Sequence, residues 1–491
     1  MNFKRVAAGI LAAATVFTAS AATFQGGVTL FSQTALTAEA ALNDIAIYYS
    51  GDIYACNNIK YKLNKSTKEA VIYGKTPKNP GGGNVTLTDV VIPGQIRVQK
   101  GDFAGTYKVT AIAEKAFKGC ELTSIDLRNC WAMKKIYNEA FMNCKKLKTV
   151  RLSSSVENMY SSGFQGCTAL TTFDFNGNSC ITDMPIYFFQ GCTALKSVSI
   201  PYSVTWIRDG AFSSSGLTSV KVSNNVTNVS SSAFAGCKNL KTVTFEAGSS
   251  KKLTLGRYAF ANCPKISAVN FDREQYTAYS NTFEGCGDSF KSYGYGAQNY
   301  TQAVAKDLLG IWGLKYNGNA SVADQKKFFN DLKHQIHVYI TYKDLENFEE
   351  GNAATVVSIR KGTCGGYARV FYNFCIAAGV PANRVLVGGN SCDHAWNYVK
   401  IKNYWYNVDA TGDYDVCDKQ TFYDKYQSGS DPYVNDAFGP RYPHRPSGWT
   451  VCLDDNIGSD DNKNYTNPRV VLFDKLLAEN GYEYNITGTR A

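Results

Sequence analysis

Histidine is scarce in this sequence, and the shortage limits the chemistry that the chain can perform. Only four histidines occur among 491 residues: His334, His337, His394 and His444. Cys392 and His394 form a C-x-H pair, but no second pair follows at the distance that a zinc finger needs. We therefore expect no metal ion, and we expect His334, His337 and His444 to have structural or surface roles.

Long apolar runs and nucleotide-binding motifs are also missing. Beyond the N-terminus no segment approaches the length of a membrane-spanning helix, and no P-loop, Rossmann glycine pattern or nucleic-acid motif occurs. The net charge of +10 is modest for 491 residues. It indicates lysines on a solvated surface, although anionic polymers or acidic proteins remain alternative partners. We expect no transmembrane segment, no cofactor and no nucleic-acid partner.

The apolar run that does occur lies at the N-terminus. Lys4 and Arg5 precede an apolar stretch over residues 6–19, and small residues allow cleavage after Ala21 or Ala40. A basic segment, a short apolar segment and a small-residue cleavage site are typical of a secretory signal peptide. We therefore interpret residues 1–40 as a signal peptide and expect a secreted, extracellular protein. Retention at the cell surface stays open.

A repeat fills the middle of the chain. Eight phenylalanines begin copies of F-x-x-C, or of its relic, at intervals of 22 to 26 residues: Phe117, Phe141, Phe164, Phe189, Phe212, Phe234, Phe260 and Phe283. Between them a second phrase, L-x-x-Φ-x-Φ with Φ apolar, recurs from Leu122 to Ile266. A period of this length predicts a solenoid, in which each copy supplies a short strand and neighbouring copies stack to bury one core.

Cysteine follows the same period. Seven of the fifteen cysteines hold the repeated place: Cys120, Cys144, Cys167, Cys192, Cys237, Cys263 and Cys286. Ser215 takes that place in the fifth copy. A position that accepts serine is a small buried plug and not half of a disulfide or a metal ligand. Cys392, Cys417 and Cys452 could include one disulfide, and the sequence leaves their pairing open.

The phrase A-F-x-G-C-x-x-L-x-x-V-x-I-P resembles the BspA-type leucine-rich repeat of bacterial surface proteins. The resemblance implies internal ladders of Phe and Cys, in a repeat region that we place at residues 102–290. Residues 41–101 lack the period but contain strand-like stretches at Lys60–Leu63 and Ala70–Tyr73. We expect these residues to form an N-terminal β cap, because the end of a solenoid needs a cover.

Three short motifs after the repeats carry a thiol, an imidazole and a carboxylate in that order. G-T-C-G-G-Y-A contains Cys364, H-A-W-N begins at His394, and W-Y-N-V-D-A-T contains Asp409. After Cys364, apolar residues recur at helical spacing until Gly379, which places Cys364 in the first turn of a helix. The free N–H groups of that turn favour a thiolate and could donate to an oxyanion. The order indicates a cysteine nucleophile with its base and orienter.

His394 and Asp409 lie at two strand-like runs that are separated by the polar pair Lys402 and Asn403. In an antiparallel hairpin with an even-numbered loop, two residues whose numbers add to an odd sum share one face of the sheet. His394 and Asp409 meet this condition, and Trp396 falls on the same face. With a three-residue loop and no bulge they would face apart.

The three motifs resemble the transglutaminase-like superfamily, and the resemblance covers residues 305–491. It implies a papain-like α+β fold with Cys364 as nucleophile, His394 as base and acid, and Asp409 as the residue that orients the imidazole. For the second oxyanion donor of this family, the candidates are Trp312 and Gln335. The expected architecture is thus multidomain: a β-rich leucine-rich-repeat solenoid, a linker at residues 291–304, and an α+β catalytic domain.

The resemblance implies a secreted or cell-surface acyl-transfer enzyme that acts on protein or peptide amides, while the repeats bind a protein or a surface ligand. With water as acceptor the reaction is peptide hydrolysis or deamidation, and with a lysine amine it is cross-linking. Of these we favour a peptidase. Two alternatives stay open: an adhesin whose transglutaminase-like domain is inactive, and a cell-wall amidase that cuts peptidoglycan stem peptides.

Overall fold

The computed structural model describes residues 44–77, 85–343, 352–389, 395–402 and 404–412, and the short strands at 450–451 and 471–472. Several features singled out above lie outside the described residues: the signal peptide, His394, His444, Cys392, Cys417 and Cys452. Within the described residues no helix is long and apolar enough to cross a membrane.

The N-terminal cap is a small closed barrel. Its strands are β1 (Ile45–Ser50), β2 (Ile53–Cys56), β3 (Ile59–Asn64), β4 (Glu69–Lys75), β6 (Gln95–Val98) and β7 (Gly105–Ile112). They pair in the order β1-β2-β3-β4-β7-β6, and β6 pairs back with β1. The predicted strands at 60–63 and 70–73 are confirmed within β3 and β4. Because β7 also pairs with the first coil of the repeats, the barrel covers that end of the solenoid.

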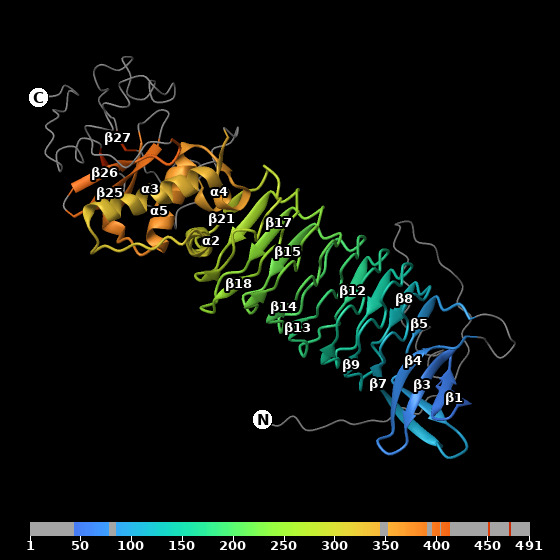
Figure 1. Cartoon of the computed structure of the whole chain (residues 1–491). Coiled ribbons are helices and arrows are strands. Elements are labelled where there is room, and N and C mark those ends of the chain that lie inside the picture. Colours follow the sequence, from blue (N-terminus) through green and yellow to red (C-terminus); the bar gives the residue numbers. More distant parts are fainter. Residues whose placement is uncertain are drawn as a thin grey trace, which may run out of the picture. The chain divides into compact units, whose positions relative to one another are not determined.

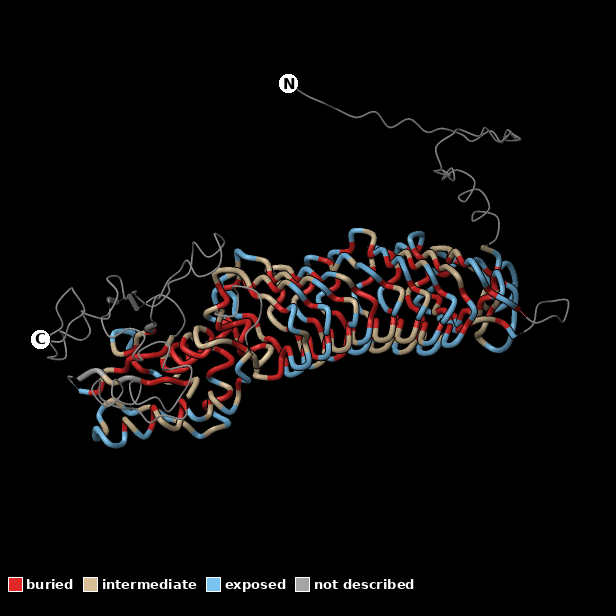
Figure 2. The backbone as a smooth tube through the Cα atoms, turned by 90° about the horizontal axis from the view of Figure 1, so that it is seen from above, coloured by how far each residue is buried: buried red, intermediate tan, exposed pale blue. Residues whose placement is uncertain are grey.

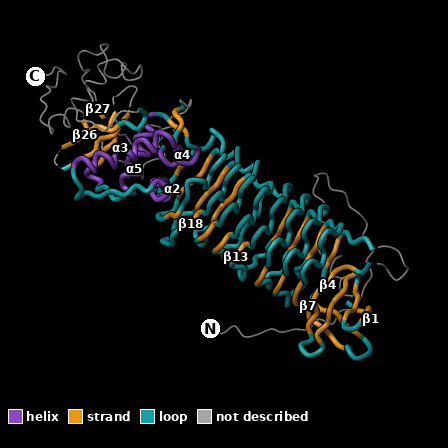
Figure 3. Tube along the Cα trace, viewed as in Figure 1, coloured by secondary structure: helices purple, strands orange, loops and turns teal. Residues whose placement is uncertain are grey.

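The repeat region consists of coils that add strands to two parallel ladders (Figures 1 and 3). The first ladder consists of two sheets, with a coil between them that has no strand at residues 195–200. One sheet contains β5 (Asp89–Val91), β8 (Ser124–Asp126), β10 (Thr149–Arg151) and β12 (Thr172–Asp174), and the other contains β15 (Ser219–Val222), β17 (Thr242–Phe245), β19 (Ala268–Phe271) and β21 (Ser292–Tyr293). The second ladder also consists of two sheets. The first continues from β7 with β9 (Lys135–Ile136) and β11 (Asn158–Met159), and the second contains β13 (Asp183–Met184), β14 (Trp206–Ile207), β16 (Asn228–Val229), β18 (Leu253–Leu255) and β20 (Tyr276–Thr277). The predicted solenoid is confirmed.

The eight repeat phenylalanines form one column inside the coils. Consecutive rings, from Phe117 to Phe283, lie 4.8 to 6.2 Å apart between centroids and are stacked. All eight phenylalanines are buried, and Figure 2 shows buried residues in red along the coils. The ring spacing follows from the spacing of neighbouring strands, which is about 4.8 Å.

The repeat cysteines form a second column, and hydrogen bonds between coils hold it. The Sγ of Cys192 donates to the carbonyl oxygen of Phe164 at 3.2 Å, and other repeat cysteines make the same bond to the preceding coil. Ser215 is buried as well, with its Oγ 3.3 Å from the Sγ of Cys237. All seven repeat cysteines are free thiols, which confirms the interpretation of a small buried plug. Burial raises the pKa of Cys192 to about 12.

Serine should be tolerated in this column. We expect Cys192→Ser to lower the free energy of unfolding by no more than about 1–2 kcal/mol, because Ser215 shows that a hydroxyl fits there. Cys192→Leu adds volume to a filled column and should cost about 1–3 kcal/mol with visible loss of cooperativity. Urea unfolding of the two variants measures both free energies of unfolding. A serine variant less stable than the leucine variant would show that the thiol itself is required.

Helices dominate the region after the last coil (Figure 3). They are α2 (Ala297–Trp312), α3 (Val322–Tyr339), α4 (Ala353–Ile359), α5 (Cys364–Ala377) and a 3-10 turn at Ala382–Arg384. A short parallel pair joins β22 (Thr341–Tyr342) to β23 (Lys361–Gly362). An antiparallel sheet has the order β24 (Val385–Gly389), β25 (Ala395–Ile401) and β26 (Tyr404–Val408), and β27 (Thr450–Val451) pairs with β28 (Val471–Leu472). The α5 helix ends before Gly379, whose φ is 92°.

The range 291–304, which we expected to be a linker, contains β21 and half of α2. Tyr300 of α2 is 1% exposed and stacks on Phe271 of the solenoid, with 4.2 Å between ring centroids. The physical reason is that the last coil of a solenoid exposes an apolar end that must be covered. The α2 helix provides that cover, and the described residues from Asp44 onward belong to one compact unit.

Polar contacts strengthen the same junction. The Oγ1 of Thr355 on α4 accepts from the N–H of Ser292 on β21 at 3.0 Å. Asp288 of the last coil accepts from Lys343 and Lys361, each at 2.6 Å. Lys343 directly follows β22, Lys361 is the first residue of β23, and β23 leads directly to α5. The last coil therefore supports the segment that precedes Cys364.

Candidate active site

Cys364 is the first residue of α5, as the spacing of apolar residues predicts. Thr363 has extended backbone angles, φ −88° and ψ −178°, and its side chain makes no capping hydrogen bond. No acidic side chain lies in the first turn. The N-cap side chain therefore leaves the first N–H groups of the helix uncapped, and the half-buried sulfur lies at a place suited to negative charge.

Tyr367 anchors this end of α5. It lies three residues after Cys364, and its hydroxyl donates to the carbonyl oxygen of Ile340, directly before β22. The ring of Tyr342 packs against it at 6.1 Å between centroids. Burial raises the pKa of Tyr367 to about 12, so the phenol keeps its donor proton at neutral pH. The start of the helix is thus fixed to the β22–β23 pair.

Asn397 joins the middle strand of the sheet to the cysteine helix. Its Nδ2 donates to the carbonyl oxygens of Ala368 at 2.9 Å and of Leu386 at 3.2 Å, and the side chain is fully buried. Ala368 lies one turn after Cys364 on α5. No role was predicted for Asn397 from the sequence, although an amide between the aromatic residues Trp396 and Tyr398 is the signal that could have found it.

A two-residue turn connects β25 to β26. Ile401 pairs with Tyr404, and Lys402 has a φ of 55°, which a two-residue hairpin turn requires. This confirms the even-numbered loop on which the shared face of positions 394 and 409 depends. His394 lies outside the described residues, so that shared face stays a prediction.

Asp409 follows the last residue of β26 and is only 3% exposed. Its Oδ1 accepts from the N–H of Thr411 at 2.9 Å and from the Oγ1 of Thr411 at 2.6 Å. The preceding residue, Val408, pairs with Asn397 of β25. The carboxylate is therefore held in a defined turn close to the strand residue that bonds the cysteine helix.

Trp312 does not lie near the sulfur. Its ring stacks on Phe374 with 5.6 Å between centroids, and Phe374 lies ten residues after Cys364, about 15 Å along a helix. Trp312 is therefore not the second oxyanion donor. Gln335 is half-buried on α3 and stays a prediction in that role.

The other histidines of the described region lie on α3. His334 is exposed and His337 is half-buried. Among the residues that the structure describes, no three His, Cys, Asp or Glu side chains gather as a metal site would require.

Comparison with known families matches two regions of the chain. The BspA type Leucine rich repeat region matches in six copies, over residues 102–184 and 178–289. The Transglutaminase-like superfamily matches residues 318–410, which include Cys364, His394 and Asp409. A search of the curated proteins found no match.

Several solved structures resemble the chain over about half of its length. The leucine rich repeat protein TpLRR of T. pallidum is 26% identical, with 43% of this chain and 88% of that chain covered and a TM-score of 0.35. A leucine rich cell surface protein from Faecalibacterium prausnitzii is 21% identical, with 50% and 82% covered and a TM-score of 0.31. The pneumococcal vaccine antigen PcpA is 14% identical, with 50% and 94% covered and a TM-score of 0.20.

The two matched families occupy the regions in which the Phe and Cys ladders and the cysteine helix were found. The chain therefore carries a BspA-type leucine-rich repeat region followed by a transglutaminase-like superfamily domain.

Proposed function

We propose that the chain is an exported, cysteine-dependent acyl-transfer enzyme that acts on protein or peptide amides. Cys364 is the nucleophile, His394 is the base and acid, and Asp409 holds the imidazole. The region 305–491 forms a papain-like α+β catalytic domain in this proposal. The repeats bind a protein or a surface ligand, which keeps recognition and chemistry in adjacent parts of one chain.

The hydrogen bond from Asn397 to Ala368 is the observation that carries the proposal. It holds β25 against α5 one turn after Cys364, at 2.9 Å. His394 is three residues before Asn397, and three residues of extended chain span about 10 Å at most. The backbone at position 394 therefore lies within about 10 Å of the contact with the cysteine helix, which supports His394 as the base of Cys364.

The hairpin register supports the second contact of the triad. Asn397 pairs with Val408, so one further pair would place Asp409 opposite Trp396. Side chains alternate along a strand, and positions 394 and 409 then share one face as diagonal neighbours. Diagonal neighbours are about 7–8 Å apart, within reach of an imidazole and a carboxylate.

This arrangement supports acyl transfer in two halves. The sulfur of Cys364 attacks the amide carbonyl carbon, and the N–H groups at the start of α5 stabilise the oxyanion. The C–N bond then breaks while His394 protonates the departing amine, which leaves a thioester. Water gives a proton to His394 and attacks the thioester, and the C–S bond breaks to release the acid and the thiol. Peptide hydrolysis is the reaction that we favour.

Alkylation rates test the nucleophile without a known substrate. We expect Cys364 to react with iodoacetamide at pH 6 at least about tenfold faster than Cys180, because the helix start and His394 both stabilise a thiolate. Cys180 is the matched control, since it is exposed whereas Cys364 is only half-buried. Buried Cys192 should not react on this timescale. Timed labelling of the folded chain, read by peptide mass spectrometry, gives the three rates.

The variant His394→Ala provides the second arm of the experiment. It should lower the rate of Cys364 toward that of Cys180, because only the helix start then remains, and it should leave the rate of Cys180 unchanged. If Cys364 in the unsubstituted chain reacts no faster than Cys180, the transglutaminase-like domain is not catalytic, and a domain that only binds its ligand becomes the better explanation.

A further inference from the structure

At one position of the repeat, the residue type alternates strictly from coil to coil, although the repeat motif does not require this. It directly follows the first apolar residue of the phrase L-x-x-Φ-x-Φ, and it holds a hydroxyl residue and a lysine in turn through all eight coils. We call these eight residues the lysine row: Thr123, Lys148, Thr171, Lys196, Thr218, Lys241, Ser267 and Lys291. No feature of the solenoid core explains the alternation, because none of these side chains belongs to the core.

Backbone hydrogen bonds show that members of the row are neighbours in space. The N–H of Lys241 donates to the carbonyl oxygen of Thr218 at 2.8 Å, and the N–H of Ser267 donates to that of Lys241 at 2.9 Å. The same bond joins Thr171 to Lys148 at 3.0 Å. The row therefore runs along the solenoid beside the first ladder, one residue per coil. With about 4.8 Å between strands, successive lysines are about 10 Å apart.

The threonine and serine residues of the row lie between the lysines. The Oγ1 of Thr171 donates to the carbonyl oxygen of Lys148 at 3.1 Å, and the Oγ1 of Thr218 donates to that of Lys196 at 3.2 Å. These two protons are thus used within the row, whereas the Oγ1 of Thr123 donates to the Oδ1 of Asp89 at 2.8 Å. Each coil with a threonine or serine in the row contributes a short neutral side chain, which leaves the lysine ammonium groups of the two neighbouring coils accessible.

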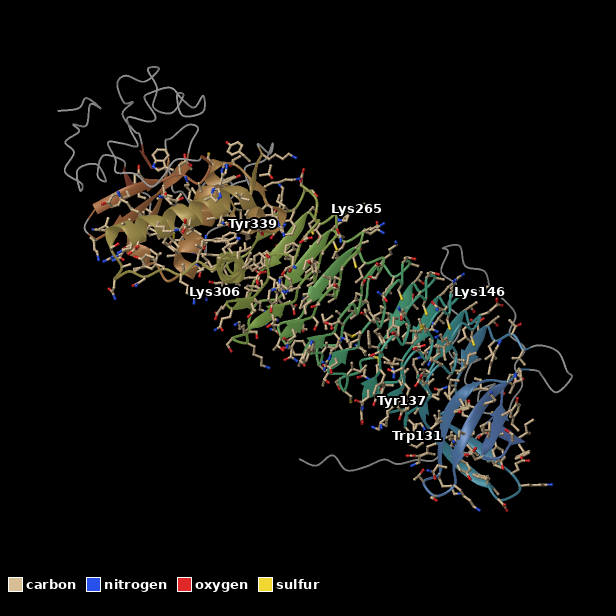
Figure 4. All side chains as sticks on the ribbon, viewed as in Figure 1. Trp131, Tyr137, Lys146, Lys265, Lys306 and Tyr339 are labelled. Carbon is tan, nitrogen blue, oxygen red and sulfur yellow. The ribbon has the colours of Figure 1, made fainter. Side chains whose placement is uncertain are left out.

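The central lysines of the row are available to a partner. Lys148, Lys196 and Lys241 are exposed, and within the described part of the chain none of them has an acidic side chain within ion-pair distance. Four further exposed lysines flank them on the same turns: Lys145, Lys146, Lys238 and Lys265. Figure 4 shows Lys146 and Lys265 along one edge of the solenoid and Trp131 and Tyr137 along the opposite edge. Exposed lysines therefore line this edge, where Lys146 is paired with Glu121 at 3.1 Å, and Lys134 and Lys135, close to Tyr137 in the chain, are exposed as well.

We propose that the lysine row binds a linear phosphodiester polymer that lies along the solenoid. An ammonium group is a compact charge with three donors and suits phosphate oxygens, whereas the row lacks arginine, the residue typical of planar carboxylate recognition. A spacing of about 10 Å exceeds the Debye length of about 8 Å at physiological salt, so each lysine makes a separate contact. A straight, regular row of charges fits a regular polymer better than the curved surface of an acidic protein. This inference does not depend on the chemistry of Cys364.

Binding of poly(glycerol phosphate) of about thirty units tests the proposal. The full chain should bind this polymer, and Lys148→Gln/Lys196→Gln/Lys241→Gln should bind it at least about tenfold more weakly at about 0.15 M salt. The slope of log Kd against log salt should fall by about 2–3, because each lysine that contacts a phosphate contributes about one. Fluorescence anisotropy with an end-labelled polymer gives both quantities.

A matched triple variant controls for net charge. Lys65→Gln/Lys100→Gln/Lys251→Gln removes the same charge from exposed lysines outside the row, and it should bind like the unsubstituted chain. Equal losses in the two triples would overturn the proposal, because net charge would then explain binding. Tighter binding of poly-L-glutamate than of the phosphate polymer would overturn it in favour of an acidic protein partner. The absence of binding to either polymer would also overturn it.

Discussion

Replacing Asp409 by asparagine will lower turnover by a factor on the order of 10² to 10⁴ and leave the melting temperature nearly unchanged. The Oδ1 of Asp409 accepts two hydrogen bonds from Thr411, and the Oδ1 of an asparagine can accept the same two. The turn should therefore survive. The variant loses the negative charge that stabilises the imidazolium of His394. Turnover of a peptide that the unsubstituted chain cleaves, together with calorimetric melting, measures both effects.

Thr411→Val is the matched control for the turn. It removes the hydroxyl that donates to Asp409 at 2.6 Å and keeps the carboxylate. We expect this variant to lose about 1 kcal/mol of stability, because a part-buried hydrogen bond is removed, and to lose less than tenfold in turnover. If Asp409→Asn instead lowers the melting temperature and leaves the rate per folded molecule unchanged, Asp409 is a turn residue and the triad is wrong.

Sequence patterns were sufficient where residues close in the chain decide the structure. The Phe and Cys columns follow from the repeat, because each coil has the same neighbours as the coil before it. The helix that starts at Cys364 follows from apolar spacing and from the stop at Gly379. The two-residue turn at Lys402 follows from a polar pair between two strand-like runs.

The remaining features depend on contacts between distant segments. The cap closes into a barrel through two parallel pairings, β1 with β6 and β4 with β7, and an alternating pattern specifies neither partner. The bond from Asn397 to Ala368 spans 29 residues. An apolar face on α2 is visible in the sequence, but that face alone could not show that it covers the last coil. The prediction of a linker at 291–304 was wrong for this reason.

The Tyr300→Ala variant will be less stable than the unsubstituted chain by about 3–5 kcal/mol, which is typical when a buried aromatic ring is removed. Tyr300 stacks on Phe271 at 4.2 Å and packs edge-on against Phe283 at 5.9 Å. It thus belongs to the core of the solenoid and of the helical domain together. Because the ring is shared, urea unfolding should show the loss with probes placed in either region.

Tyr300→Phe is the matched control for the loss of the ring. Tyr300→Phe keeps the ring and loses only the hydroxyl contact with Ser358 at 3.2 Å, so it should cost about 1 kcal/mol. A chain that begins at residue 305 lacks Tyr300 and Val304, two buried residues of α2. Since such a chain loses half of the helix that packs on the last coil, we expect it to unfold without a cooperative transition. A cooperative transition in that shortened chain would show that the helical domain is independent of the repeats, and the solenoid would then need another cover for its last coil.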